Sequence, residues 1–267
     1  MIFSKPVPFS EALAYLRQKS LLPTTGRTAD FARVSAAIRE RAAFSAGVIK
    51  AEHLQQVLDS ARSLVAGETD FATQRLALKD YLQSSGYVPS EEDRGTLRDL
   101  SSDARLQVQV MTPVQMAQGY GYWQQGQDTA VLDAYPAQEF LRVESREVPR
   151  EDWPQRWVAA GGTLYGDRMV ALKDDPVWTK LSRFGQPYEP FDFGSGMGTE
   201  DVSRSEAMDL GLIDRDTQIA PEDRPFNQDL QATPEVRDSA LRNLLSATGL
   251  GSFDGSGTFH FEPQPAP

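Results

Sequence analysis

Hydrophobic residues recur every three or four positions through residues 9–85, with polar residues between them. This spacing predicts amphipathic helices that pack through their apolar faces. Turn-forming residues divide the pattern into four segments, 10–23, 28–47, 54–67 and 69–86. Ser10, Thr28 and Thr69 are expected to cap three of these helices. The short links between the segments favour an antiparallel helical bundle.

A longer helix is predicted from about Ser102 onward. One of its faces carries the apolar residues Leu106, Val110, Val114 and Ala117. Pro113 lies inside this run, and because proline lacks a backbone N–H it is expected to kink or divide the helix. The aromatic residues that follow, Tyr120, Tyr122 and Trp123, are expected to pack in the core.

The hydrophobic pattern changes after Pro136. Residues 140–148, FLRVESREV, alternate between apolar and polar, which is typical of a half-buried strand. Residues 163–165 and 168–172 resemble the two strands of a hairpin around the turn at Gly166. These segments together predict a small antiparallel sheet.

A helix that carries two tryptophans is predicted between the strand and the hairpin. Trp153 and Trp157 are four residues apart and so share one face, and Asp152 can cap the helix. The predicted fold class is therefore α+β and mainly α. Its expected regions are a helical N-terminal lobe (1–100), a helix plus a small α+β module (101–213) and an extended C-terminal arm with one helix (214–267).

Two pairs of polar residues in the sequence have the positions expected at the start of a helix. Adjacent Asp174 and Asp175 invite a metal-site interpretation, but Asp175 followed by Pro176 fits a helix start. Ser203 and Glu206 have the spacing of a capping box. We therefore predict helix starts at both places and no metal ligands.

The segment PFDFGSGMG, residues 190–198, holds three alternating glycines. It lacks the lysine of a P-loop, the spacing of a dinucleotide fingerprint and the G-x-S-x-G spacing of a nucleophile elbow at Ser195. Phosphate binding through backbone N–H groups stays open as an alternative. We interpret residues 185–193 as an extended run over a hydrophobic surface, after which the glycines turn the chain into the helix at Ser203.

The composition narrows the possible chemistry. The chain has no cysteine and only two histidines, His53 and His260. Disulfides, thiolate catalysis and cysteine zinc sites are thereby excluded, and few imidazoles remain for a catalytic metal. A serine triad would need His53, inside a predicted helix, or His260, in a tail rich in Gly and Pro, and we favour neither. We predict no catalytic residue, no cofactor and no metal.

The net charge of −11 counts against a nucleic-acid partner, because phosphate binding needs clustered cations. The charge is uneven, however: residues 1–65 hold nine Lys/Arg and five Asp/Glu, or +4, which leaves −15 for the rest. We interpret this basic region as a solvated helix face, with nucleic acid or an acidic partner as the alternative. The chain has no apolar run of membrane-spanning length and no secretory signal pattern, so we expect no membrane partner and synthesis in the cytosol.

The order of the motifs resembles one known family. The segments concerned are FSEALAYLRQKSLLP, AAFSAGV, PAQEFLRVESREVPREDWPQRWVAAGG, RMVALKDDPVWTKLSRFGQPYEPFDFGSGM and VSRSEAMDLGLI. Their spaced Trp, Pro and Gly residues are similar to those of the minor head proteins F of Mu-like tailed phages, in the phage head-morphogenesis family. The resemblance covers about residues 8–213. Many longer relatives end in a Cys/His-containing segment, which this sequence lacks.

This resemblance implies a structural, non-enzymatic minor head protein that acts in head morphogenesis and procapsid assembly at or near the portal vertex. The implied partners are the phage portal protein, the major capsid protein, or both, with packaged DNA as a further candidate. The implied location is the virion head, and the host cytoplasm during assembly. The residues expected to shape the module or to contact a partner are Trp153, Trp157, Trp178, Pro190, Phe191 and Phe193.

Two alternatives accompany this interpretation. The first is an ADP-ribosyltransferase-like or other nucleotide-using enzyme, because some head proteins of this kind are fused to such domains. Its strand-lined site would pair an arginine with a glutamate, drawn from Arg146, Arg168, Glu144 and Glu147. The second is a DNA-binding head-interior protein that uses the basic region at 1–65.

Overall fold

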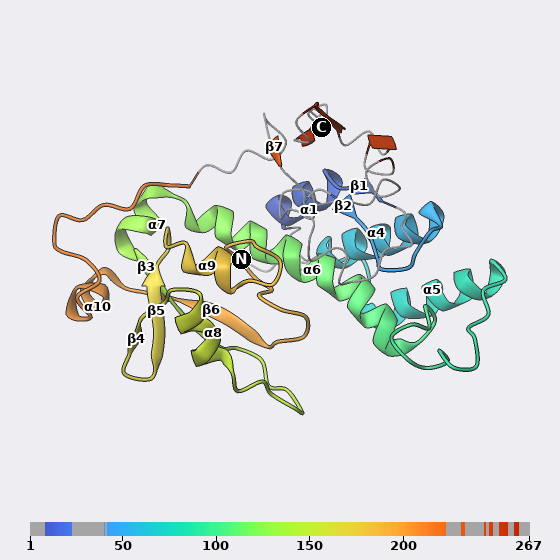
Figure 1. Ribbon diagram of the computed structural model, residues 1–267, viewed down its shortest axis with the longest axis horizontal. Helices are drawn as coiled ribbons and strands as arrows, with labels where there is room; N and C mark the ends of the chain where they lie inside the picture. Colours follow the sequence, from blue (N-terminus) through green and yellow to red (C-terminus); the bar gives the residue numbers. More distant parts are fainter. Residues whose placement is uncertain are drawn as a thin grey trace, which may run out of the picture. The chain divides into compact units, whose positions relative to one another are not determined.

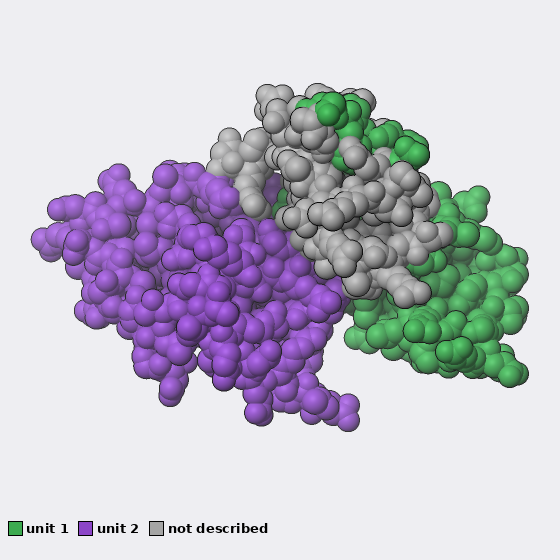
Figure 2. All heavy atoms as spheres, viewed as in Figure 1, with its two compact units in different colours: residues 1–117, 225–267 green, residues 118–224 purple. Residues whose placement is uncertain are grey.

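The computed structural model describes residues 9–22, 40, 42–222, 231–232, 243, 246–247, 251–255 and 259–261. The chain divides into two compact units, which are coloured separately in Figure 2. Unit 1 comprises residues 1–117 and 225–267, and unit 2 comprises residues 118–224. Several helices and a four-stranded antiparallel sheet (Figure 1) confirm the predicted α+β, mainly α fold class.

Three of the four helices predicted in the first third of the chain are present in unit 1. They are α1 (Ser10–Arg17), α4 (Ala51–Val65) and α5 (Phe71–Ser84). The predicted caps were displaced by one residue. Helix α1 includes Ser10 and follows Phe9. Asp70, not Thr69, caps α5, because its carboxylate accepts the N–H of Thr73 at 3.0 Å.

The helix predicted over 28–47 is only partly testable, since residues 23–39 lie outside the described part of the chain. Its predicted extent to Gly47 is wrong. Residues Ala42–Ala43 form a short strand, β2, which pairs in parallel with β1 (Ser20–Leu21). Pairing with a distant segment has here outweighed the helix propensity of the local sequence.

Helix α6 (Asp103–Gly126) runs unbroken through Pro113, so of the two predicted effects, a kink or a division, the division is wrong. The predicted apolar face is confirmed, because Leu106, Val110, Val114 and Ala117 are all buried. Interior proline costs a helix about 3 kcal/mol. We attribute the continuity of α6 to burial of apolar side chains on both sides of Pro113, since tertiary packing supplies most helical stability.

The core of unit 1 is formed by side chains from three helices. Val57 of α4, Leu78 and Leu82 of α5, and Leu106 and Val110 of α6 form one buried cluster. These are the positions that the three- and four-residue spacing places on the apolar faces. The periodicity therefore identified these helices and the faces that they bury.

The sheet of unit 2 has the strand order β4-β5-β3-β6. Its strands are β3 (Ala137–Arg142), β4 (Leu164–Tyr165), β5 (Arg168–Leu172) and β6 (Met197–Val202). The predicted hairpin is confirmed as β4 and β5, which pair in antiparallel register with Tyr165 opposite Arg168. Strand β6 was not predicted from the sequence.

The strand predicted at 140–148 is shifted to residues 137–142, so its C-terminal half is wrong. Strand β3 ends because the N–H groups of Val143 and Glu144 both donate to the carbonyl oxygen of Gly196, at 2.9 and 3.0 Å. Two donors on one acceptor cannot continue an evenly paired ladder. The alternation of polar and apolar residues thus continues into a loop.

Both faces of this sheet are covered by helices. One face carries Phe140, Met169 and Met197, which pack with residues of α8 (Trp153–Ala159) and α9 (Val177–Leu181). The other face carries Ala137, Val170 and Val202, which pack with Ala207 of α10 (Arg204–Asp209). Helix α7 (Thr129–Ala134) precedes β3 and is capped by Asp128.

The C-terminal part of the chain contains a small sheet of order β7-β9-β8. Its strands are β7 (Gln231–Ala232), β8 (Gly251–Phe253) and β9 (Phe259–Phe261). The helix predicted between β7 and β8 lies almost wholly outside the described residues, although residues 243, 246 and 247 are helical. Residues 214–222 form no helix or strand.

The Glu189 side chain binds the outer edge of the sheet. The Glu189–Pro190 peptide bond is cis, and Glu189 Oε1 accepts the N–H of Thr199, in edge strand β6, at 2.9 Å. Burial raises the pKa of Glu189, and its hydrogen bond to the Thr199 N–H offsets part of this shift. Helix α6 approaches the backbone of Glu189 at Gly119, where a methyl group would overlap the Glu189 carbonyl oxygen.

Substitution at Gly119 tests this close approach. We expect Gly119→Ala to lower the free energy of unfolding by about 1–3 kcal/mol, because the added methyl group must displace backbone atoms. Gly126→Ala is the matched control in the same helix, since its methyl group would meet only the Lys173 Nζ at 3.9 Å. The control should be neutral or stabilising by up to about 1 kcal/mol. Urea denaturation measures both, and equal effects would contradict the interpretation.

Candidate functional site

The residues that the sequence singled out in unit 2 meet in one aromatic core. Trp153, Trp157, Trp178 and Phe191 are each at most 2% exposed. They come from α8, from α9 and from the loop before β6. Pro190 is also buried, whereas Phe193 is half-buried.

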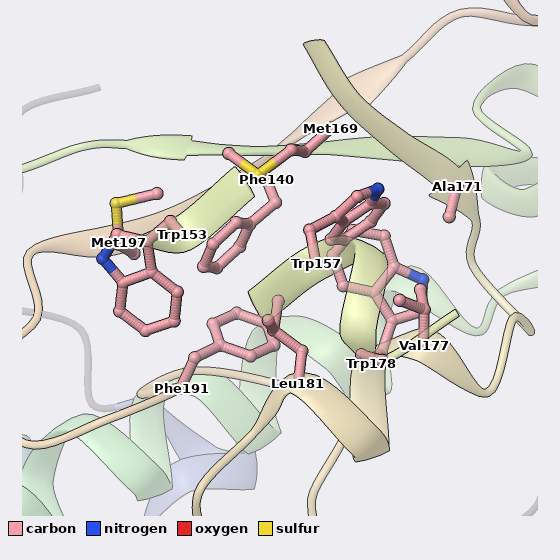
Figure 3. Close-up of a cluster of buried hydrophobic side chains, with 11 residues drawn as sticks. Phe140, Trp153, Trp157, Met169, Ala171, Val177, Trp178, Leu181, Phe191 and Met197 are labelled. Carbon is pink, nitrogen blue, oxygen red and sulfur yellow. The ribbon is translucent and has the colours of Figure 1, made fainter. Parts of the chain in front are cut away.

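Figure 3 shows the Phe140 ring of β3 within this core, between Trp153 and Trp157. The Phe140 ring meets Trp153 and Phe191 edge to face, with centroids 5.1 and 5.0 Å apart. Trp157 and Trp178 meet in the same manner at 5.2 Å. Edge-to-face contacts of this kind add about 0.5–1.5 kcal/mol per pair to the free energy of burial.

Two of the buried indoles also fix the backbone next to them. Trp157 Nε1 donates to the carbonyl oxygen of Thr163 at 2.9 Å, and Trp178 Nε1 donates to that of Leu172 at 2.7 Å. These bonds anchor the two ends of the β4–β5 hairpin to the helices. The tryptophans therefore shape the module, and their burial places any partner contact of unit 2 on other residues.

Ser203 caps α10 as predicted, whereas the cap position of α9 is Pro176, one residue after the predicted Asp175. Asp175 Oδ1 accepts the N–H of Val177 at 2.7 Å, and Ser203 Oγ accepts that of Glu206 at 3.3 Å. The Glu206 carboxylate pairs with Arg168 at 2.7 Å. Within the described residues, no group of three potential metal ligands lies together.

The glycine segment turns the chain into a strand, so the prediction that it leads directly into the helix at Ser203 is wrong. Gly194 and Gly196 have φ values of +55° and +67°, which side chains rarely adopt. Ser195 is buried, and its Oγ accepts the N–H of Met197 at 3.2 Å, where β6 begins. Ser195 therefore stabilises the turn.

A cavity that the sequence did not predict lies beside the aromatic core. We call it the arginine hollow; its volume is about 570 Å³. It is lined by Asp152, Arg156, Ala159, Ala160, Lys180, Leu181, Ser182, Arg183 and Asp192. Because these residues come from three separate segments, their sequence spacing gave no motif.

Asp192 is the centre of an ion-pair cluster at this hollow. Its side chain is 6% exposed and lies 3.1 Å from Arg156, 3.6 Å from Arg183 and 3.8 Å from Arg150. The Arg156 guanidinium also lies 3.8 Å above the Trp153 ring. Oriented guanidinium groups next to an aromatic face are typical of sites that recognise carboxylate or phosphate.

The arginines named for the alternative enzyme site form internal contacts. Arg168 Nη2 lies 2.5 Å from Glu139 and its Nη1 lies 2.7 Å from Glu206, and these bonds raise its pKa. Arg146 pairs with Glu144 and donates through Nε to the carbonyl oxygen of Gly194 at 2.9 Å. Glu147 lies exposed in the loop after β3. The structure therefore places these residues at two different locations.

His53 and the described part of the basic region also have structural contacts. His53 is 1% exposed and lies 3.4 Å from Gln109 Oε1. Lys19 donates to the carbonyl oxygen of Glu40 at 2.5 Å, and Arg62 pairs with Asp59 at 2.9 Å. Among the aromatics of α6, Trp123 is buried as predicted, whereas Tyr122 is 67% exposed, which corrects its assignment to the core.

Comparison with known proteins gives no relative: no family model, curated protein or solved structure matches this chain. In the described part of the chain, no helix combines the length and apolarity needed to cross a membrane.

The Asp192 cluster gives a first prediction for the site. We expect Asp192→Asn to lower the free energy of unfolding by about 1–3 kcal/mol, because the change removes the buried anion that three arginines share. Asp80→Asn, an exposed change of the same kind on α5, should alter it by less than about 0.5 kcal/mol. Chemical denaturation gives both values, and a neutral Asp192→Asn variant would contradict the assigned role.

His53 gives a prediction about pH. Burial lowers its pKa below the ordinary 6.5, and the nearby Arg105 charge acts in the same direction. Because the folded state binds this proton less readily than the unfolded state, the stability contributed by neutral His53 is lost as the pH falls below about 6.5. NMR titration of the imidazole should give a pKa below 6.5. Acidification from about pH 7 to 5 should destabilise the parent more than His53→Gln, and equal losses would contradict the assignment.

Proposed function

We propose that this chain is a structural minor head protein of a tailed phage, which acts in head morphogenesis at or near the portal vertex. Its partners would be the portal protein, the major capsid protein, or both. The burial of the motif residues is the observation that supports the proposal most directly. The tryptophans and Phe191 that carry the resemblance are all buried in one core, so the motif encodes a folded body.

A folded unit of this kind suits an assembly role, because its core side chains are enclosed while other side chains on its surface can contact partners. Several apolar side chains of unit 2 are exposed, among them Val143 at 46%, Val148 at 85% and Val158 at 55%. Apolar side chains at a surface are where protein contacts gain free energy on burial. Because the tryptophans are enclosed, we assign the docking role to such surface residues.

The two alternatives are less well supported by the contacts of their candidate residues. Arg168 and Arg146 of the enzyme hypothesis each pair with carboxylates of unit 2. In the basic region, Lys19 and Arg62 also make internal contacts. Saturable binding of a nicotinamide nucleotide would favour the enzyme. A steep salt dependence of DNA affinity would favour the nucleic-acid hypothesis.

Co-expression tests the proposed function. The full-length chain should co-elute in size-exclusion chromatography with the portal protein or the major capsid protein encoded in the same phage genome. It should also be found in purified heads by mass spectrometry. Failure to co-elute with either partner, together with absence from heads, would contradict the proposal.

Surface substitutions locate the contact in the same experiment. Val148→Glu introduces a charge at an exposed valine of unit 2, which is 85% exposed, and Val88→Glu does so in unit 1, where Val88 is 77% exposed. Both variants should remain folded, because neither side chain is buried. If unit 2 docks as we propose, Val148→Glu should weaken co-elution and Val88→Glu should not.

A further inference from the structure

We infer that the arginine hollow binds a phosphate monoester. The observation that leads to this inference is the balance of charge around the cavity. The charged residues that line it or contact Asp192 are four cations and two carboxylates, namely Arg150, Arg156, Lys180, Arg183, Asp152 and Asp192. They leave two positive charges at one place in a protein whose net charge is −11.

The buried carboxylate orients this positive charge. Asp192 holds the three guanidinium groups within 3.1–3.8 Å, and each of them also contacts the backbone or a ring, Arg183 lying 5.6 Å from the centre of the Phe193 ring. Arg150 Nη2 donates to the carbonyl oxygen of Phe193 at 3.0 Å, and Arg156 stacks on Trp153. A ligand that binds here meets groups that are already ordered, so it loses less entropy on binding.

The magnitude of the charge favours a phosphate monoester over singly charged anions. A monoester carries a charge of about −1.5 to −2 at neutral pH, which matches the local excess. A carboxylate or a backbone phosphodiester of DNA carries only one negative charge. DNA also needs cations spread along a surface, whereas these converge on one cavity.

The size of the hollow indicates whether a group attached to the phosphate can also fit. The hollow is open to solvent, and its volume of about 570 Å³ is similar to that of small-molecule pockets, about 300–1,000 Å³. Leu181 and Ala160 are buried and give part of the wall an apolar character. The site therefore has space for a phosphate with an attached group, such as a nucleoside monophosphate or the 5′ end of a DNA strand.

Calorimetric titration of the full-length chain tests this inference, with sodium chloride used to hold the ionic strength constant. Inorganic phosphate and adenosine monophosphate should bind with a Kd below about 1 mM, and adenosine should not bind. A short DNA strand with a 5′ phosphate, compared with the same strand without it, identifies the source. If the phosphorylated strand binds more tightly than adenosine monophosphate, the natural ligand is a DNA end. If adenosine monophosphate binds more tightly, the natural ligand is a small molecule.

Matched variants keep the test specific to the hollow. Lys180 is exposed, and no ion pair is seen for it within the described chain, so Lys180→Gln should leave folding intact and weaken phosphate binding about two- to fivefold. Asp152→Asn should tighten binding by a similar factor. Arg94→Gln and Asp80→Asn make the same charge changes in unit 1 and should have no effect.

Two results would overturn the inference. One is the absence of saturable binding at about 10 mM phosphate, tenfold above the weakest expected Kd. The other is an equal response of the Lys180 and Arg94 variants, which would indicate general charge attraction. The inference does not depend on the proposed function, because co-elution with head proteins is measured without phosphate ligands.

Discussion

The architecture of unit 2 depends on burying three tryptophans and two phenylalanines between one sheet and two short helices. Helices α8 and α9 have seven and five residues, too few to be stable alone. Removing a buried Trp or Phe side chain costs about 3–5 kcal/mol, against a total stability of about 5–15 kcal/mol for a typical domain. The ring contacts therefore hold the helices, the hairpin and the loop before β6 in a single arrangement.

The sequence predicted those parts of the fold that are determined locally. The apolar spacing of α4, α5 and α6 and the turn at Gly166 are local signals, and they led to the correct elements. Cap residues and strand ends were less accurate, because Asp70 and the Gly196 carbonyl act through hydrogen bonds that a pattern of residue types does not specify.

The parts that were missed depend on contacts between distant segments. Strand β6 contains glycine, threonine and two acids, and it is a strand because it pairs with β3. The arginine hollow unites side chains from the loop before α8, from α8 itself and from the segment after α9 around Asp192. Of the candidate residues, the three tryptophans lie buried in the core of the module, where large aromatic side chains contribute most of the buried area.

The hydrogen bond of the Glu189 side chain affects whether two copies of this chain can pair through the edges of their sheets. A strand at the margin of a sheet offers unpaired backbone groups to any similar strand nearby. In β6, the Thr199 N–H is instead bound by the Glu189 side chain, which belongs to the same molecule. That intramolecular bond removes one attachment point for a strand of another molecule, and so it lowers the tendency of this edge to pair between molecules.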